Sequence, residues 1–363
     1  MSIDSGIIGL PQSGKTTIFN ALTQGKATTD SLTPNIGVAK VPEPRLKILA
    51  DMLHPKRVVH AEARYIDIGA SVKGMAKEQA ISGELLNRLS TVDALINVVR
   101  AFTDDRIPHV EGSLDVNRDI ATADLELAFS DLAIIERRLG RINISLKGAK
   151  PPERQMFLHE HELLNKIKAE LEKDVPIRKQ KLTPDEARTI TNYQFLSAKP
   201  LLIVVNIGED QLPQAASLEA ELNSRYSQPN LRLITLCGKL EMELAQLDNG
   251  EAEVFRAELG MKESGLDRTV RASYELLGLL SFFTTASDEV KAWSIQNGTT
   301  AVKAAGKIHS DMERGFIRAE VISYNDLVRC GSLTEARKKG LLRLEGKNYI
   351  VQDGDVITFL FNV

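Results

Sequence analysis

Apolar residues fall into short, nearly continuous runs separated by longer amphipathic stretches. The runs that predict strands are residues 6–8, 58–68, 92–100, 201–206 and 231–236. Runs of this kind are typical of parallel strands that are covered by helices. Between them, stretches such as residues 17–23 place Ile18, Phe19 and Leu22 on one helical face. Strands alternating with helices predict an α/β sheet with right-handed crossovers.

A different periodicity interrupts this sheet at about residues 123–197. Apolar residues recur there at alternating spacings near three and four: Leu125, Ala128, Leu132, Ile135, Leu139, Ile142 and Leu146, and then Phe157, Leu164, Ile167 and Leu171. Two helices that share such a seam predict an antiparallel coiled-coil hairpin. Its turn is expected near residues 148–152, which contain Gly and Pro.

Basic residues gather around the predicted tip of this hairpin. They are Arg137, Arg138, Arg141, Lys147, Lys150 and Arg154. Clusters of this kind can follow a phosphate backbone, but the exposed ends of helices are also commonly charged. The pattern therefore leaves a polyanion-binding tip and a solvated helix end as alternatives.

The pattern changes again from about residue 280. Residues 282–285 and 290–295 predict a β-hairpin, and a helix is expected near residues 300–309. The last stretch, residues 349–363, predicts two strands around an Asp-Gly-Asp turn. These elements indicate a small α+β domain, in which Trp293 is expected to be a core residue. Its charges nearly balance, so its sequence alone does not argue for RNA binding.

Composition narrows the class of protein without identifying it. The 363 residues are 43% hydrophobic and 26% charged with a net charge of −3, which is ordinary for a soluble protein of two or three domains. The net charge of the whole chain does not indicate nucleic-acid binding. The two cysteines, Cys237 and Cys330, lack metal-ligand spacing, and a reduced, cytoplasmic location is expected. No run reaches the ~18 apolar residues of a membrane span, so no membrane association is expected.

One stretch carries recognisable chemistry, the segment from Gly9 to Thr16. It fits the pattern G-x-x-x-x-G-K-[ST] of a phosphate-binding loop and lies between a predicted strand and a predicted helix, as that motif requires. Loop amides and the helix N-terminus can then face an anion. Lys15 is expected to reach the β- and γ-phosphates, and the Thr16 hydroxyl is expected to ligate Mg²⁺. The predicted phosphate-side residues are Pro11, Gln12, Ser13, Gly14, Lys15, Thr16 and Thr17.

Two further segments are candidates for the metal site. Asp67 ends a predicted strand near the phosphate loop, where P-loop enzymes place a magnesium-water ligand, although a lone Asp can also form a turn. Residues 24–57 are polar and predicted to be irregular. They could form a switch loop whose hydroxyls complete the Mg²⁺ shell, or a plain surface loop.

The whole chain resembles the YchF family, the Obg-like ATPases of the P-loop GTPase superfamily (TRAFAC class). The matching stretches are residues 6–11, 33–38, 72–74, 92–100, 304–311, 314–319 and 353–363. The resemblance implies an α/β Ras-like P-loop NTPase domain (1–122 and 198–279), an inserted coiled-coil hairpin (123–197) and a C-terminal β-grasp or TGS domain (280–363). It also implies ATP and Mg²⁺ as ligands and the ribosome or ribosomal RNA as a partner.

The resemblance also predicts the base-binding residues. Guanine-specific relatives carry Asn-Lys-x-Asp, whereas this chain has Asn206, Ile207, Gly208 and Glu209. Ile207 removes the lysine that braces the base, and Glu209 would misplace the carboxylate. Loss of a bidentate pair reduces discrimination for guanine by orders of magnitude, and the resemblance implies the family's preference for ATP over GTP. Asn206 is retained for the base edge, and Cys237 and Gly238 occupy the second base-side loop.

Other positions depart from the family pattern. The switch Asp-x-x-Gly becomes Asp67-Ile68-Gly69-Ala70, Ser71 is polar where the family is apolar, and Ser31 replaces the switch threonine as a candidate metal ligand. No glutamine follows Asp67 as a catalytic residue. His109 matches the loop histidine that the family uses to orient water, a role open to imidazole near neutral pH. His109 and Lys15 are the predicted catalytic residues.

These expectations combine into a slow Mg²⁺-dependent ATPase that acts as a molecular switch on ribosomes and is expected to be monomeric. Because Ala70 and Ser71 depart from the family pattern, a nucleotide-gated binding module with negligible hydrolysis is an alternative function. A GTPase and a P-loop small-molecule kinase are weaker alternatives, the latter because a coiled coil and a TGS-like domain suit macromolecular contacts.

Overall fold

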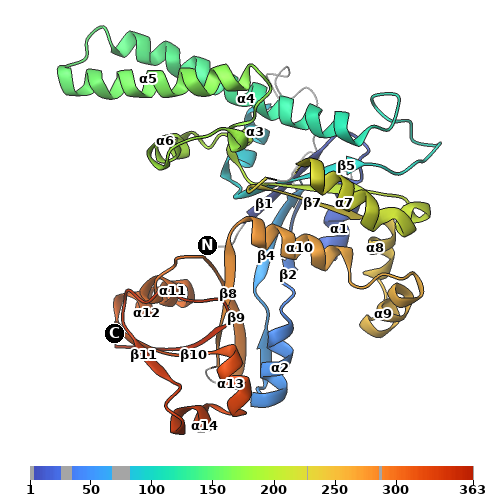
Figure 1. The fold of residues 1–363 in the computed structure, drawn as a ribbon, viewed down its shortest axis with the longest axis vertical. Helices are drawn as coiled ribbons and strands as arrows, with labels where there is room; N and C mark the ends of the chain where they lie inside the picture. Colours follow the sequence, from blue (N-terminus) through green and yellow to red (C-terminus); the bar gives the residue numbers. More distant parts are fainter. Residues whose placement is uncertain (1–3, 26–34, 68–81, 227, 286–287, 363) are drawn as a thin grey trace. The chain divides into compact units, whose positions relative to one another are not determined.

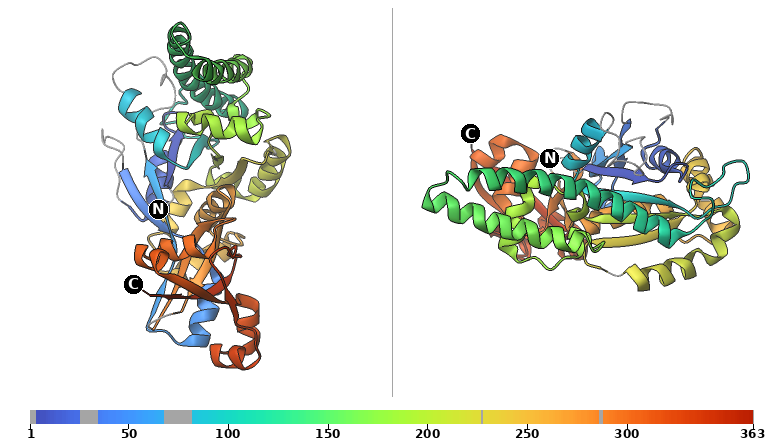
Figure 2. Two further views of the ribbon diagram at one scale, coloured as in Figure 1. Left: turned by 90° about the vertical axis from the view of Figure 1, so that its left-hand side faces the viewer. Right: turned by 90° about the horizontal axis from the view of Figure 1, so that it is seen from above.

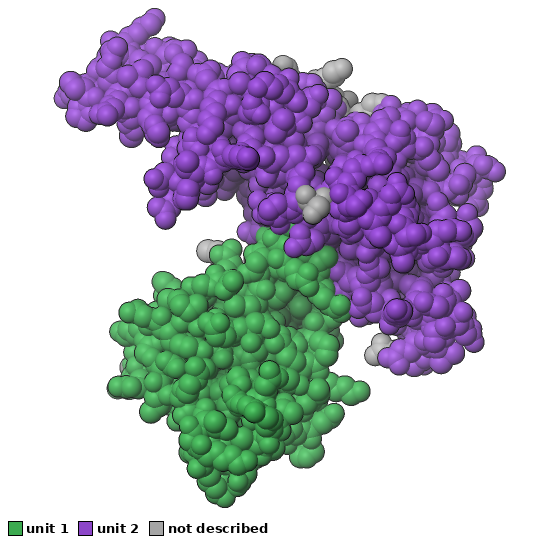
Figure 3. All heavy atoms as spheres, viewed as in Figure 1, with its two compact units in different colours: residues 1–3, 38–64, 270–363 green, residues 4–37, 65–269 purple. Residues whose placement is uncertain are grey.

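The structure is a computed structural model that describes residues 4–25, 35–67, 82–226, 228–285 and 288–362 (Figure 1). The candidate ligand Ser31 and the switch positions Ala70 and Ser71 lie outside these ranges. The chain divides into two compact units, one of residues 4–37 and 65–269 and the other containing residues 38–64 and 270–363 (Figure 3). This division differs from the predicted boundaries, because the hairpin groups with the first unit and residues 38–64 group with the C-terminal residues.

A six-stranded sheet has the order β2-β4-β1-β5-β6-β7. Its strands are β1 Asp4–Gly9, β2 Asn35–Lys40, β4 Glu62–Asp67, β5 Ala94–Arg100, β6 Leu201–Asn206 and β7 Leu231–Leu236. Strand β1 pairs in parallel with β5, β5 with β6, and β6 with β7. All of β5 and β6 is buried, which explains their continuous apolar sequences. The α/β fold is confirmed, with parallel pairing from β1 through β5 and β6 to β7.

Helices follow most of these strands. They are α1 Lys15–Thr23, α3 Ser82–Thr91, α7 Ala215–Tyr226, α8 Gly238–Leu244, α9 Asn249–Glu258 and α10 Gly265–Leu276, with the short helix η4 Glu209–Gln214. One core cluster joins them to the sheet, with Ile8, Leu95 and Ile203 from the strands and Leu222 and Leu240 from the helices. None of the helices within the described ranges is long and apolar enough to cross a membrane.

The inserted segment forms the predicted hairpin. Helices α4 Val116–Ser145 and α5 Pro151–Leu171 lie side by side (Figure 2). Their shared core includes Ile135, Ile142 and Leu164, each fully buried. Asp115 caps α4 by accepting a hydrogen bond from the Arg118 amide at 3.0 Å. The chain then returns through η1 Ile177–Lys179, α6 Pro184–Ile190, η2 Thr191–Tyr193 and η3 Leu196–Ala198.

The prediction that residues 24–57 are irregular is wrong over much of that range. Strand β2 and helix α2 Pro44–Leu53 lie within it. Glu43 caps α2 by accepting from the Arg45 amide, Pro44 occupies the first turn, and Leu46 and Leu49 are buried. A proline after an acidic residue, followed by leucines three apart, is the helix-start signal that the polar surroundings obscured.

The single strand predicted over residues 58–68 is instead two strands. Strand β3 Arg57–Val59 pairs in parallel with β9 Glu289–Gln296, whereas β4 belongs to the other sheet. His60 and Ala61 separate the two strands. The pattern of apolar residues could not show this break, because both halves are built from strand-forming side chains.

A second six-stranded sheet has the order β11-β10-β12-β8-β9-β3. Its remaining strands are β8 Leu279–Thr284, β10 Phe316–Ser323, β11 Arg343–Glu345 and β12 Asp355–Phe361. The associated helices are α11 Ala301–Ile308, α12 Ser310–Arg314, α13 Tyr324–Cys330 and α14 Leu333–Lys338. The predicted β8–β9 hairpin and the helix near residue 300 are confirmed. Phe282, Phe316 and Phe359 pack together in this core with Ala304 of α11.

The second strand predicted near residue 350 is not formed as a strand. Ile350 makes only an isolated bridge with Thr300. The Asp355 carboxylate accepts from the Gln352 amide at 2.9 Å and from the Tyr349 hydroxyl at 2.7 Å, and these bonds turn the chain before β12. Side-chain to backbone bonds of this kind compete with strand pairing.

Candidate nucleotide-binding site

The phosphate-loop segment lies between β1 and α1, as the motif predicts. Gly9 and Gly14 have φ values of 151° and 90°. A Cβ at Gly9 would lie 2.4 Å from the Val98 carbonyl oxygen, and one at Gly14 would lie 2.3 Å from the Asn206 amide nitrogen. Glycine is therefore required at both positions. Gly14 is also the N-cap of α1 and has no side chain to bond the first amides, which leaves them to face an anion.

Lys15 is buried inside its own loop. Its Nζ donates hydrogen bonds to the carbonyl oxygens of Leu10 at 2.9 Å and Gly9 at 3.2 Å, and the residue is 8% exposed. Burial lowers the pKa of Lys15 to about 8, and the nearby Asp67 carboxylate offsets part of this shift. A positive charge held in a desolvated loop is stabilised by an incoming anion. The buried positive charge of Lys15 therefore favours phosphate binding at this loop.

Thr16 and Asp67 meet beside this lysine. The Thr16 hydroxyl donates to Asp67 Oδ2 at 2.8 Å, and Asp67 is fully buried at the end of β4. A hydroxyl and a carboxylate are oxygen donors of the kind that Mg²⁺ prefers, and Mg²⁺ typically takes further ligands from water and substrate phosphates. Within the described residues, no cluster of three or more His, Cys, Asp or Glu side chains forms a separate metal site.

Asn206 joins the phosphate loop to the second base-side loop. Its Nδ2 donates to the Ser13 carbonyl oxygen at 3.0 Å, and its Oδ1 accepts from the Gly238 amide at 2.9 Å. Asn206 and Ser13 are both buried. Both polar atoms of the Asn206 side chain are therefore engaged by the two loops, so this residue fixes the spacing between them.

The other predicted base-side residues differ in their exposure. Ile207 is 1% exposed and packs in the core, and the Cys237 side chain is also buried, which raises the pKa of its thiol. Glu209 is half-exposed and pairs with Lys239 at 2.8 Å. Sequence reasoning missed Lys239, although its position directly after Gly238 could have drawn attention to it.

His109 is held within the loop that follows β5. Its Nδ1 accepts from the Glu111 amide at 3.1 Å, so the proton of the neutral ring lies on Nε2. Nε2 lies 3.0 Å from Asp119 Oδ2, and the two side chains are only 5% and 2% exposed. Asp119 also accepts from the Arg118 guanidinium. In this pose Nδ1 accepts from the Glu111 amide and Nε2 faces the Asp119 carboxylate, so the ring must move before it can accept a proton from water.

Two residues that sequence reasoning missed shape this loop. Arg100, at the end of β5, donates to the carbonyl oxygens of Ile107 at 2.8 Å and Phe102 at 3.1 Å. Asp119 lies in the first turn of α4 and faces His109. Arg100 ends the stretch 92–100 that resembles the family, but no spacing marked either residue as functional, because each acts through a loop that only the fold brings to it.

The remaining predicted phosphate-side residues are buried to different degrees. Ser13 is buried, Pro11 and Thr17 are half-buried, and Gln12 is exposed with a φ of 61°. A positive φ at a residue other than glycine is uncommon. The loop therefore bends sharply at Gln12, and the Ser13 amide that follows donates to the Leu10 carbonyl oxygen at 3.4 Å.

The burial of Lys15 predicts a pH-dependent affinity for ATP. Its pKa in the folded protein, about 8, lies below the ordinary value of 10.5, so the charge is lost from about pH 8 upward. Phosphate binds the charged form, so we expect the dissociation constant for ATP to increase above pH 8, by at most about tenfold per pH unit. Isothermal titration calorimetry from pH 7.5 to 9.5 measures this, and a constant affinity over that range would contradict it.

The same shift has a consequence for stability. Because the folded pKa is the lower one, the unfolded chain binds more protons between about pH 8 and 10.5. Lys15 therefore lowers the free energy of unfolding below pH 8, and this destabilisation decreases as the pH rises from about 8 to 10.5.

Comparisons with known proteins agree with this architecture. The family model YchF-GTPase_C, described as a protein of unknown function (DUF933), matches residues 279–362. "Ribosome-binding ATPase YchF" of Bacillus subtilis is 40% identical over 370 residues, and its namesake from Escherichia coli O157:H7 is 37% identical over 368 residues. Both alignments cover 100% of each chain.

A solved structure shows the same fold. The YchF GTPase of Schizosaccharomyces pombe superposes with a TM-score of 0.85 at 29% identity, covering 99% of this chain and 98% of that one. Relatives of this similarity span the parallel sheet, the hairpin and the C-terminal sheet alike. The chain belongs to the YchF family of P-loop nucleotide-binding proteins.

Proposed function

We propose that this protein is a Mg²⁺-dependent ATPase that hydrolyses ATP slowly and uses its nucleotide state to control association with the ribosome in the cytoplasm. The contact between Thr16 and Asp67, 2.8 Å long and adjacent to Lys15, carries the proposal. It brings a phosphate-binding lysine and two oxygen donors for Mg²⁺ to one place. The names of the Bacillus and Escherichia relatives, "Ribosome-binding ATPase YchF", support the activity and the partner.

The base-side residues support a preference for ATP over GTP. A guanine site needs a lysine that braces the base and a carboxylate that accepts two hydrogen bonds. The side chain in the lysine position, Ile207, is buried in the core. The residue in the carboxylate position, Glu209, pairs with Lys239. A site without the bidentate acceptor loses its discrimination for guanine.

Parallel titrations test this preference. We expect ATP to bind at least about tenfold more tightly than GTP, a difference of ~1.4 kcal/mol. The measurement is calorimetric titration of the purified protein with each nucleotide in Mg²⁺ buffer. Equal affinities would remove residues 206–209 as the basis of base choice and favour a GTPase.

A second candidate function is a nucleotide-gated binding module with negligible hydrolysis. The engagement of His109 by Asp119 and the Glu111 amide favours it, because the residue expected to orient water is occupied in this pose. Both candidates use the same phosphate loop. They differ only in whether bound ATP is converted to ADP.

The hairpin tip is the proposed ribosome contact, but its six cations are not equivalent. Arg138 is bound by Glu160 through two hydrogen bonds of 2.7 Å, and Tyr193 also donates to Glu160. Arg138 therefore stabilises the hairpin. Arg141, Lys147 and Lys150 are exposed at the end of the hairpin. Arg137 and Arg154 donate to the backbone carbonyl oxygens of Ala133 and Leu146, so the first three are the side chains that we assign to a polyanion.

Reversing these charges should weaken ribosome association. We expect Arg141→Glu, Lys147→Glu and Lys150→Glu together to reduce co-sedimentation with ribosomes and to flatten its salt dependence, because fewer counterions are released. ATP turnover without ribosomes should be unchanged. A control triple variant reverses the exposed Lys173, Arg188 and Arg225 of the same unit. Equal co-sedimentation of the two variants at every salt concentration would show that the tip is only a solvated helix end.

A further inference from the structure

Helix α9 presents apolar side chains to solvent instead of burying them. Val254 is 59% exposed and Phe255 is 51% exposed, and Leu259, directly after the helix, is 45% exposed. Among the α9 residues whose burial the structure describes, only Ala252 is buried. A surface helix normally turns its apolar stripe toward the core. Helix α9 therefore exposes the kind of face that such helices usually bury.

The exposed apolar residues share one face with two acidic residues. Residues three and four apart are neighbours on the surface of a helix. Glu251 therefore lies next to Val254 and Phe255, and so does Glu258, one turn further along. Leu259 lies next to Phe255, whose carbonyl oxygen accepts from the Leu259 amide at 3.1 Å. These five residues form what we call the α9 surface.

This part of the chain is also strongly acidic. Residues 238–263 contain seven acidic and three basic residues, a net charge of −4, compared with −3 for the whole chain. Within α9, Glu251, Glu253 and Glu258 are all exposed. The single basic residue of the helix, Arg256, is half-buried and cannot neutralise three carboxylates. The α9 surface therefore combines exposed apolar side chains with an excess of negative charge.

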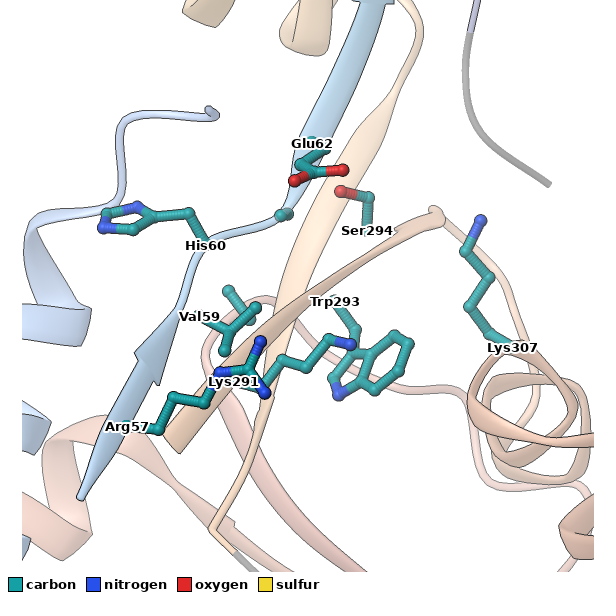
Figure 4. A pocket seen from close by; sticks show the side chains of 10 residues that line it. Arg57, Val59, His60, Glu62, Lys291, Trp293, Ser294 and Lys307 are labelled. Atoms are coloured by element: carbon teal, nitrogen blue, oxygen red, sulfur yellow. The ribbon is translucent and has the colours of Figure 1, made fainter. Parts of the chain in front are cut away.

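The charge of the α9 surface limits the partners that fit it. Carboxylates repel nucleic-acid backbones and anionic lipids, and two copies of the same acidic face repel each other. By contrast, cations gather at the hairpin tip and around a pocket on the C-terminal sheet, where Figure 4 shows Arg57, Lys291 and Lys307. A contiguous group of exposed apolar side chains commonly marks a protein interaction site. Set among carboxylates, such a group suits a partner that carries apolar side chains between lysines or arginines.

We propose that the α9 surface docks a basic segment of another protein. Apolar side chains of that segment cover Val254, Phe255 and Leu259, and its lysine or arginine side chains pair with Glu251 and Glu258. Removing apolar area from water supplies affinity, while charge pairs at the rim set orientation and exclude wrong partners. The proposal goes beyond the ATPase function and requires neither hydrolysis nor a contact by the hairpin tip.

A designed peptide tests this chemistry directly. The probe is a fluorescein-labelled, 14-residue amphipathic peptide of leucine and lysine, titrated into the full-length protein with anisotropy as the readout. We expect saturable binding. A peptide of equal charge with serine in place of leucine should bind at least about fivefold more weakly, because it covers no apolar area. Absence of saturable binding, or equal binding of the two peptides, would overturn the proposal.

Variants locate the binding on the protein. We expect Phe255→Ser and Glu258→Gln each to weaken binding of the leucine–lysine peptide at least about fivefold. The matched controls lie on the hairpin of the same unit. They are Phe129→Ser, which removes a phenylalanine that is 45% exposed, and Glu162→Gln, which removes an exposed carboxylate. Equal weakening by the controls would mean non-specific attraction and would overturn the assignment to α9.

Sedimentation velocity separates a foreign partner from a second copy of this chain, which could reach the α9 surface through its own basic hairpin tip. We expect the wild type to show no concentration-dependent association. Association that is lost in Phe255→Ser would overturn the proposal in favour of a contact between copies. ATP affinity should be the same in the wild type and in all four variants, so a failure at α9 leaves the proposed ATPase standing.

Discussion

Replacing Lys15 with alanine is expected to weaken ATP binding by at least about a hundredfold, equivalent to ~2.7 kcal/mol. The Lys15 ammonium is the buried positive charge of the phosphate loop, and the residue is only 8% exposed. A charge-assisted hydrogen bond to phosphate in such a site is stronger than a neutral one. Without it, the loop amides must hold the phosphate charge alone.

Interpreting the Lys15→Ala result requires a check of folding and a control variant. The Gly9 and Leu10 carbonyl oxygens lose their donor in Lys15→Ala, so circular dichroism and thermal unfolding must first show that the variant is folded. Lys173→Ala removes an exposed lysine of the same unit and should bind ATP as the wild type does. Near-normal affinity in folded Lys15→Ala, measured by calorimetry, would remove the phosphate loop from the account.

Replacing His109 with alanine is expected to slow single-turnover hydrolysis by about ten- to a hundredfold while ATP affinity changes by no more than a few-fold. Orienting or deprotonating the attacking water stabilises the transition state, so its loss appears in the rate and not in ground-state binding. His109→Gln should retain part of the rate, because an amide can orient water but cannot accept its proton.

The burial of His109 means that this test needs a stability control. Its imidazole is 5% exposed and lies 3.0 Å from Asp119, so alanine also leaves a small cavity beside this carboxylate, which keeps Arg118 as a partner. Thermal unfolding measured alongside the rate separates a loss of stability from a loss of chemistry. If the wild type turns over no faster than His109→Ala, the histidine is idle and the non-hydrolysing module is the better account.

Regular, buried elements were predictable from sequence. Strands β6 and β7 have the predicted bounds, because continuous apolar runs leave few alternatives. The hairpin was predictable from the periodic apolar residues of its two helices. Of those predicted residues, only Leu125 lies outside the hairpin's core cluster and its partly buried neighbours. The phosphate loop was predictable because its spacing is a direct consequence of backbone geometry around an anion.

Features that depend on distant pairing were not predictable. Arg57 and Lys291 become neighbours only because β3 joins the C-terminal sheet, and no local pattern marks that pairing. Asp119 and Arg100 act on the His109 loop through contacts made after folding. Helix α2 was missed because its surroundings are polar, although Pro44 and two buried leucines mark it.

A single-turnover assay, with protein in excess over radiolabelled ATP and followed to ADP, tests most directly the proposal that this protein binds Mg·ATP at the phosphate loop and slowly hydrolyses it. We expect slow, complete conversion in Mg²⁺ buffer and none with EDTA or in Lys15→Ala. Recovery of bound ATP intact from the wild type in Mg²⁺ buffer would contradict it.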